Sequence, residues 1–339
     1  MKPKDTAEHY ILSSSPHVHA DISVRRLMLD VIIALLPTTA AGVLFFGMPA
    51  VWTIAMCVSA ALVTEALCRI AMKRESTVGD LSAVLTGLLL ALNLPAGIPL
   101  WMAAVGSVFA IGVAKQAFGG LGMNPFNPAL AARAFMLISF TGPMTTWLKP
   151  FWWRTPEAMT TATPLASMKT MFAAEATTSA SPHGLCSAAT GGLQQIWNMA
   201  IGNTPGCIGE VSAIALAIGA AYLLWRRVIT WHIPAAFIAT VFVYSLFAGG
   251  APAMMQVLSG GVMLGAFFMA TDYVTSPTTS AGKLVFGFGC GLLCMLIRQF
   301  GGYPEGCSFA ILVMNAMCPL INRWTRPRPF GAKRASFSS

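Results

Sequence analysis

Charged residues are scarce in this chain of 339 residues: Asp, Glu, Lys and Arg together make up only 10% of it, whereas apolar residues make up 56%. A soluble protein of this length has roughly a quarter of its residues charged. The mean hydropathy is +0.68. This composition excludes a soluble globular protein and predicts an integral membrane protein.

Motifs of soluble catalysis are also missing. The sequence has no glycine fingerprint of a dinucleotide-binding fold, no P-loop and no HExxH zinc motif. We therefore expect no metal site, no catalytic residue that acts alone, and no NADH site of a recognisable kind. The basic residues cluster beside apolar segments, which reports membrane orientation and lipid contact and not nucleic-acid binding.

Because residues 1–24 are polar, we expect no signal peptide before the first apolar segment. The eight cysteines form no CxxC pair. Cys186 and Cys207 lie in the longest polar loop, so a disulfide between them is an open alternative if that loop faces an oxidising compartment.

Long apolar segments are what the chain does contain. About 20 apolar residues cross a bilayer, and by that measure we predict an all-α integral membrane protein of about ten transmembrane helices. Asn93 and Pro95 interrupt the third, and Asn-Pro pairs at 124–125 and 127–128 precede or open the fifth. The predicted spans lie near 27–48, 51–71, 80–95, 98–117, 126–144, 211–227, 231–249, 253–271, 283–300 and 305–321.

The distribution of basic residues predicts the orientation. With a cytoplasmic N-terminus, 16 of the 21 Lys and Arg residues fall on the inner side. Both termini are then cytoplasmic and the longest loop is extracytoplasmic. The predicted organisation is a cytoplasmic N-terminus (1–26), a first five-helix repeat (27–144), an extracytoplasmic loop (145–210), a second five-helix repeat (211–321) and a basic cytoplasmic tail (322–339).

One tripeptide occurs at a similar place in both halves: Phe118-Gly119-Gly120 and Phe300-Gly301-Gly302. Each copy follows a long apolar segment and leads into an apolar helix. Because each half has an odd number of predicted spans, the two copies should lie on opposite faces of the membrane. Inverted halves of this kind form sites near the bilayer midplane from broken helices.

Charged residues inside the predicted spans are functional candidates, because each is costly in hydrocarbon. The alternative is a structural ion pair or a solvated helix end. For Asp30, Arg133 and Asp272 we favour a role in a polar interior, whereas for Glu65 and Arg298 both interpretations stay open. Glu305 lies near the outer end of its span.

The helix starts at 122–128 and 302–306 are a further candidate site. They contain Asn124, Asn127 and Glu305, and their glycines and prolines interrupt regular structure. Free backbone N–H groups at helix N-termini suit a phosphate, the edge of a flavin ring or another anion.

Five segments carry a resemblance to a known family. They are GMNPFNPALAARAF (122–135), IGNTPGCIGEVSAIALAIG (201–219), FFMATDYVTSP (267–277), YPEGCSFAILVMNAMCPLI (303–321) and the tail NRWTRPRPFG (322–331). With these segments the chain resembles the D subunit of the Rnf/Rsx electron transport complex and, more distantly, the B subunit of the sodium-pumping NADH:quinone reductase. The resemblance covers essentially the whole chain.

The resemblance implies a covalent flavin. In this family FMN is attached to a threonine through a phosphoester bond by a flavin transferase, at a pattern like Asp-x-x-Ser-Gly-Ala-Thr. Here Glu157 stands for the Asp, Thr160 for the Ser and Thr161 for the Gly, followed by Ala162 and Thr163. Thr163 is thus the expected FMN carrier, with Thr160 and Thr161 as competing acceptors.

The resemblance further implies a second, non-covalent flavin such as riboflavin in the membrane part, the other subunits of the complex as partners, and a bacterial inner membrane with the 145–210 loop in the periplasm. The expected function is to couple electron transfer to ion translocation. The alternatives are a channel or secondary transporter without a redox cofactor, since inverted repeats also form those, and a quinone-reductase B-type subunit.

Overall fold

The computed structural model describes residues 23–75, 77–152, 163, 165–166, 194–248, 252–259, 261–302 and 305–326. Their secondary structure is almost entirely helical, as expected. The first half contains α1 (Val24–Phe46), α2 (Met48–Ala71), η1 (Val78–Asp80), α3 (Ser82–Leu92), α4 (Leu100–Val108), the π-helix η2 (Phe109–Gln116), α5 (Pro128–Ser139) and α6 (Thr141–Met144).

The second half follows a helical stretch at 194–201. It contains α9 (Ala213–Trp225), α10 (His232–Ala248), α11 (Ala253–Leu258), α12 (Val262–Leu264), the π-helix η4 (Gly265–Met269), α13 (Ser280–Phe300) and α14 (Cys307–Trp324).

Three of these helices are long and apolar enough to cross a membrane by themselves: α1, α2 and α13. The apolar helices α3, α5 and α9 have 11 to 13 residues, fewer than the roughly 20 that a bilayer needs. Each predicted span coincides with at least one described helix. The number of ten crossings and the inverted repeats nevertheless stay predictions.

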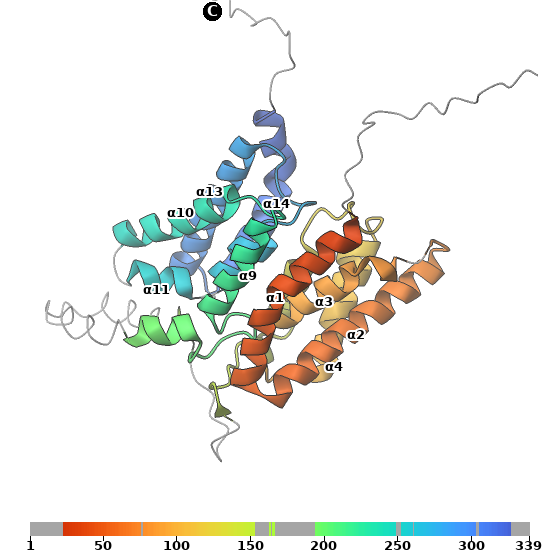
Figure 1. Ribbon diagram of the computed structural model, residues 1–339, viewed down its shortest axis with the longest axis horizontal. Coiled ribbons are helices and arrows are strands. Elements are labelled where there is room, and N and C mark those ends of the chain that lie inside the picture. Colours follow the sequence, from red (N-terminus) through yellow and green to blue (C-terminus); the bar gives the residue numbers. More distant parts are fainter. Residues whose placement is uncertain are drawn as a thin grey trace, which may run out of the picture.

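The helices form two groups that meet at α1 and α9 (Figure 1). The first-half helices lie on one side, and α10, α13 and α14 on the other. At the junction α9 approaches α1 so closely that a Cβ atom on Gly219 would collide with the carbonyl oxygen of Ala34. Only glycine permits this contact without moving a backbone.

The last part of the predicted outer loop folds back into the protein. The Ile208 amide donates to the Leu94 carbonyl at 3.1 Å, and the Gly209 amide donates to the Leu92 carbonyl at 2.7 Å. Ile208 is completely buried. This segment therefore satisfies the carbonyl groups that α3 leaves free where Asn93 and Pro95 end it, and it belongs to the helical body.

The predicted span 253–271 is broken into α11 and the combined α12–η4. Gly261 adopts a left-handed conformation (φ 69°) at the break, which favours glycine. The two Phe-Gly-Gly copies also differ, since Gly119 and Gly120 have φ values of 120° and 103°, whereas Gly301 has −74°. The repeated sequence does not produce a repeated backbone.

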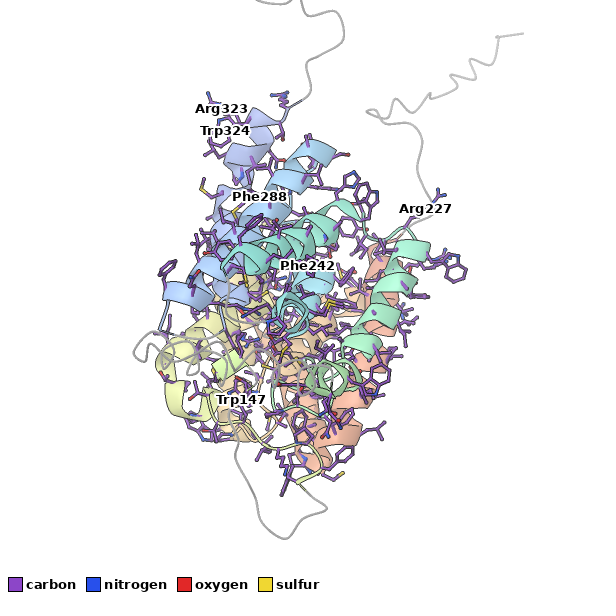
Figure 2. All side chains as sticks on the ribbon, turned by 90° about the vertical axis from the view of Figure 1, so that its left-hand side faces the viewer. Trp147, Arg227, Phe242, Phe288, Arg323 and Trp324 are labelled. Carbon is purple, nitrogen blue, oxygen red and sulfur yellow. The ribbon has the colours of Figure 1, made fainter. Side chains whose placement is uncertain are left out.

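The outer surface fits a membrane location. Trp52, Val63 and Leu67 on α2 are each more than half exposed, which a lipid-facing helix tolerates. Arg227 and Arg323 lie toward one end of the molecule, whereas Trp147 lies toward the opposite end (Figure 2). This separation agrees with the polarity predicted from the basic residues, although the sidedness itself stays a prediction.

Candidate functional site

A buried arginine joins the two halves. Arg133, on α5, is 6% exposed and forms a salt bridge with Glu305, which lies just before α14. Its second terminal nitrogen donates to Asn93 Oδ1 at 2.6 Å. The end of α3, the middle of α5 and the start of α14 therefore meet at one guanidinium group, and its charge is compensated by Glu305.

The fold-back segment adds a second carboxylate to this cluster. The Cys207 amide donates to Glu210 Oε2 at 3.5 Å, and the Cys207 thiol donates to the Asn93 carbonyl at 3.2 Å. The ligand atoms of Cys207, Glu210 and Glu305 lie within 4.8 Å of one another. Because Arg133 is bonded to Glu305, we interpret this group as a charge cluster and not as a transition-metal centre. We call Arg133, Glu210, Glu305, Asn93 and Cys207 the Arg133 cluster.

The environment of Glu210 favours a bound proton near neutral pH. Burial, followed by the neighbouring Glu305 carboxylate, raises the pKa of Glu210 to about 7, against the effect of Arg133. Desolvation disfavours an ionised carboxylate in this way. Glu210 was not singled out from the sequence, because it lies in a segment predicted to be a solvated loop.

Thr163 lies beside this cluster. It lines a cavity of about 360 Å³ together with Thr204, Ser259, Glu210 and Glu305. Thr163 is 5% exposed, and its hydroxyl oxygen accepts a hydrogen bond from the Ala166 amide at 3.1 Å. The structure thus brings together two of the predicted site residues, Thr163 and Glu305.

The cavity suits the linker of a phosphoester-bound flavin. Its lining includes the hydroxyl groups of Thr163, Thr204 and Ser259. Ser259 Oγ and Glu210 Oε1 are buried and have no hydrogen-bond partner among the described residues. A serine hydroxyl can donate to a phosphate oxygen. Glu157, Thr160 and Ala162 lie outside the described residues.

Three more of the predicted site residues line a second cavity. Asn124, Asn127 and Asp272 line a cavity of about 830 Å³ with Lys115 and Phe268. Asn127 caps α5, since its Oδ1 accepts from the Ala129 amide at 3.1 Å. The mixture of aromatic and polar side chains in the lining fits a small-molecule site.

The Asp272 carboxylate is partly shielded in this cavity. It accepts a hydrogen bond from the Thr275 hydroxyl at 3.2 Å. Burial raises the pKa of Asp272 above its ordinary value, and hydrogen bonds from Val274, Thr275 and Tyr273 oppose this shift. Asp272 is therefore not a freely solvated helix end.

The remaining interior charges have structural partners. Asp30 pairs with Arg226 at 3.3 Å and accepts a hydrogen bond from Tyr222. Glu65 pairs with Lys115 at 3.1 Å, so the Lys115 ammonium group is turned into the protein. These pairs join helices that the sequence could not place together.

The structure gives hydrogen-bond partners for two further residues from the sequence analysis, Arg298 and Cys207. Arg298 donates to the carbonyls of Gln256 and Ser259, both at 2.7 Å, and so holds the end of α11. Cys207 is buried with its thiol bonded to Asn93, whereas Cys186 lies outside the described residues. The possible disulfide between these cysteines stays a prediction.

Broken helices whose polar ends meet inside an apolar helical body are typical of membrane proteins that move ions or electrons. The sequence profile of the NQR2, RnfD, RnfE family matches residues 11–331. The chain belongs to this family.

Named relatives give the family a functional context. The chain is 47% identical over 326 residues to the D subunit of a Na⁺-translocating ferredoxin:NAD⁺ oxidoreductase complex from Acetobacterium woodii, and the match covers 95% of this chain and 96% of the relative. It is 41% identical to the D subunit of a proton-translocating ferredoxin:NAD⁺ oxidoreductase complex from Clostridium ljungdahlii, over 96% of this chain and 97% of the relative.

A third relative is the D subunit of an ion-translocating oxidoreductase complex from Halorhodospira halophila. It is 38% identical, over 95% of this chain and 96% of the relative. The expected resemblance to D-type subunits is confirmed.

Proposed function

We propose that this chain is the flavin-carrying D-type subunit of a bacterial inner-membrane complex that couples electron transfer to ion translocation, with FMN attached to Thr163 through a phosphoester bond. Family membership and the names of the relatives support its place in such a complex. The observation that carries the flavin assignment is the position of Thr163 in a polar cavity next to Glu210 and Glu305.

A flavin bound there supplies redox chemistry that no side chain of this protein has. The chain supplies position and charge. Thr163 provides the oxygen of attachment, and Ser259 and Thr204 present hydroxyl groups to the cavity. Arg133 compensates the Glu305 carboxylate, which reduces the repulsion that a phosphate would meet.

The burial of Thr163 has a consequence for maturation. Since the residue is 5% exposed, a flavin transferase must reach Thr163 before its side chain becomes buried. We propose that the transferase acts on the 145–210 loop on the periplasmic side, with both termini of the chain in the cytoplasm.

The second cavity is the proposed place for a non-covalent flavin such as riboflavin. Asn124, Asn127 and Asp272 would bind its polar edge, and Phe268 would contact the ring. Mutual packing of flavin and aromatic side chains is favourable. Loss of acid-extractable flavin after substitution of Asn127 by Leu would support this placement.

Intact mass of the purified chain tests the covalent assignment. Co-expression with a flavin transferase should add an FMN-sized increment to the peptide that contains Thr163. Thr163→Ala should lose the increment, whereas Thr163→Ser keeps a hydroxyl group and should retain it at least in part. An unmodified wild-type chain, or an increment on Thr160 or Thr161, contradicts the assignment.

A further inference from the structure

The Arg133 cluster contains one more negative group than positive group. Glu210 and Glu305 supply two carboxylates, and Arg133 supplies the only guanidinium or ammonium group bonded to them among the described residues. Arg133 is directly bonded to Glu305, so Glu210 is the carboxylate in excess. A buried carboxylate without a compensating charge is strongly unfavourable.

The cavity beside Glu210 holds unused polar atoms. Ser259, which is 6% exposed, lines the cavity, and its hydroxyl group has no partner in the described part of the chain. Glu210 Oε1 is likewise buried without a partner there. With the Thr163 and Thr204 hydroxyls and Glu305, the lining offers hydroxyl and carboxylate oxygen atoms from separate segments of the chain.

We propose that this cavity binds one monovalent cation, either H⁺ or Na⁺, between Glu210 and Glu305. In the chain without covalent flavin, one positive charge brings the two carboxylates and Arg133 to electrical neutrality. Oxygen donors are the ligands that hard cations prefer, and a proton satisfies the same charge requirement on Glu210 alone.

The groups that face Glu210 come from several elements. They are Arg133 on α5, Glu305 before α14, Cys207 in the fold-back segment, and Gly261 at the start of α12, where a Cβ atom would lie 3.7 Å from Glu210 Oε1. Arg133 is fixed by Asn93 and Glu305. The positive charge that can leave and return is therefore the cation bound at Glu210, and not Arg133.

This inference extends the proposed role in ion translocation to a specific site, and it does not depend on the flavin. Cation binding is to be measured on the purified complex produced both with and without a flavin transferase. A response in the protein without covalent flavin supports the site even if the Thr163 assignment fails.

Sodium binding is tested by the midpoint of thermal unfolding of the complex. The midpoint is measured while NaCl replaces choline chloride at constant ionic strength. A cation that binds the folded state raises the unfolding midpoint. Glu210→Gln should abolish the rise, whereas the control Glu75→Gln, at an exposed position, should behave as wild type. Ser259→Ala removes a hydroxyl ligand without changing charge and should raise the half-saturating Na⁺ concentration about fivefold.

If Na⁺ does not change the unfolding midpoint, proton binding is tested instead. Infrared difference spectra between acidic and alkaline buffer should then show a protonated carboxyl band in the wild type that Glu210→Gln removes and Glu75→Gln retains. A wild-type complex with neither a Na⁺ response nor such a band overturns the proposal. A Na⁺ response that is undiminished in both Glu210→Gln and Ser259→Ala overturns it as well.

Discussion

Two buried ion pairs in this protein differ in their balance of charge. Lys115 and Glu65 form a pair of one positive and one negative group, 2% and 0% exposed. Arg133 pairs with Glu305, but Glu210 lies nearby as a second carboxylate. The Lys115–Glu65 pair has no net charge, whereas the Arg133 cluster has one excess negative charge that a further cation can compensate.

The two groups also connect different parts of the chain. Lys115 Nζ binds Ser82 Oγ at 2.7 Å as well as Glu65, and Thr77 and Gln116 donate to the same carboxylate, so all these residues belong to the first half. The Arg133 cluster links α3 and α5 to the fold-back segment and to the start of α14. The cluster thus joins the two halves of the chain beside Thr163.

The largest expected effect is on stability, in the balanced pair. Lys115→Met leaves the Glu65 carboxylate buried without a cation, which typically costs about 3–5 kcal/mol. The midpoint of thermal unfolding should fall strongly. Lys283→Met, at a partly exposed lysine whose ammonium group donates to Thr230, should change stability by no more than about 0.5 kcal/mol. Equal effects of the two substitutions would show that the buried pair has no special role.

The pH dependence of stability should report Glu210. Burial raises its pKa from 4.5 to about 7 in the folded protein, so the folded state holds the proton more tightly than the unfolded state. The free energy of unfolding should therefore fall as the pH rises from about 4.5 to about 7, by on the order of 3 kcal/mol. Above that range this contribution should be level.

Glu210→Gln provides the control for this pH profile, measured in buffer without Na⁺. The glutamine cannot titrate, so the decline between about pH 4.5 and 7 should become shallower by the contribution of Glu210. Superimposable profiles for the two proteins would assign the titration to another group.

A smaller loss of folding stability is expected for Glu305→Gln. The substitution removes one partner of Arg133, but the Glu210 carboxylate lies close enough to replace it. We expect a loss of about 1–2 kcal/mol, less than for Lys115→Met. The double substitution of Glu305 and Glu210 by Gln removes the reserve carboxylate and should be clearly worse than the sum of the two single changes. Additive effects would contradict the idea of a reserve carboxylate.

The smallest effect on folding stability is expected for Asp272→Asn. The asparagine keeps an acceptor for the Thr275 hydroxyl, so stability should change by less than about 1 kcal/mol. Attachment of FMN to Thr163 should be unaffected, while acid-extractable flavin and electron transfer should fall if Asp272 binds a flavin in the second cavity. Unchanged values of both would leave Asp272 as a residue that stabilises the turn after η4.

The sequence predicted the helical membrane architecture and several of the site residues. Arg133, Asp272 and Glu305 were identified because charge inside an apolar segment is rare and costly. The Asn-Pro starts were identified as irregular backbone, and the structure places Asn127 as the N-cap of α5. These signals are local, so a sequence carries them without knowledge of the fold.

Other features depend on contacts between distant segments. Glu210 is indistinguishable from a solvated loop residue until Ile208 and Gly209 bind the end of α3. The partner of Glu65 was similarly hidden, because the contact between Lys115 and Glu65 joins residues 50 positions apart. The two Phe-Gly-Gly copies mark equivalent places in the sequence but not equivalent backbone conformations, because the surroundings decide the dihedral angles that glycine adopts.

Flavin reduction and membrane potential, followed together in vesicles that carry the assembled complex, test most directly whether the unbalanced charge at Glu210 matters for coupling. Glu210→Gln should leave Thr163 modified and the flavin reducible, while the membrane potential generated falls to a small fraction of the wild-type value. A wild-type potential in Glu210→Gln would contradict the account and make the Arg133 cluster a structural junction only.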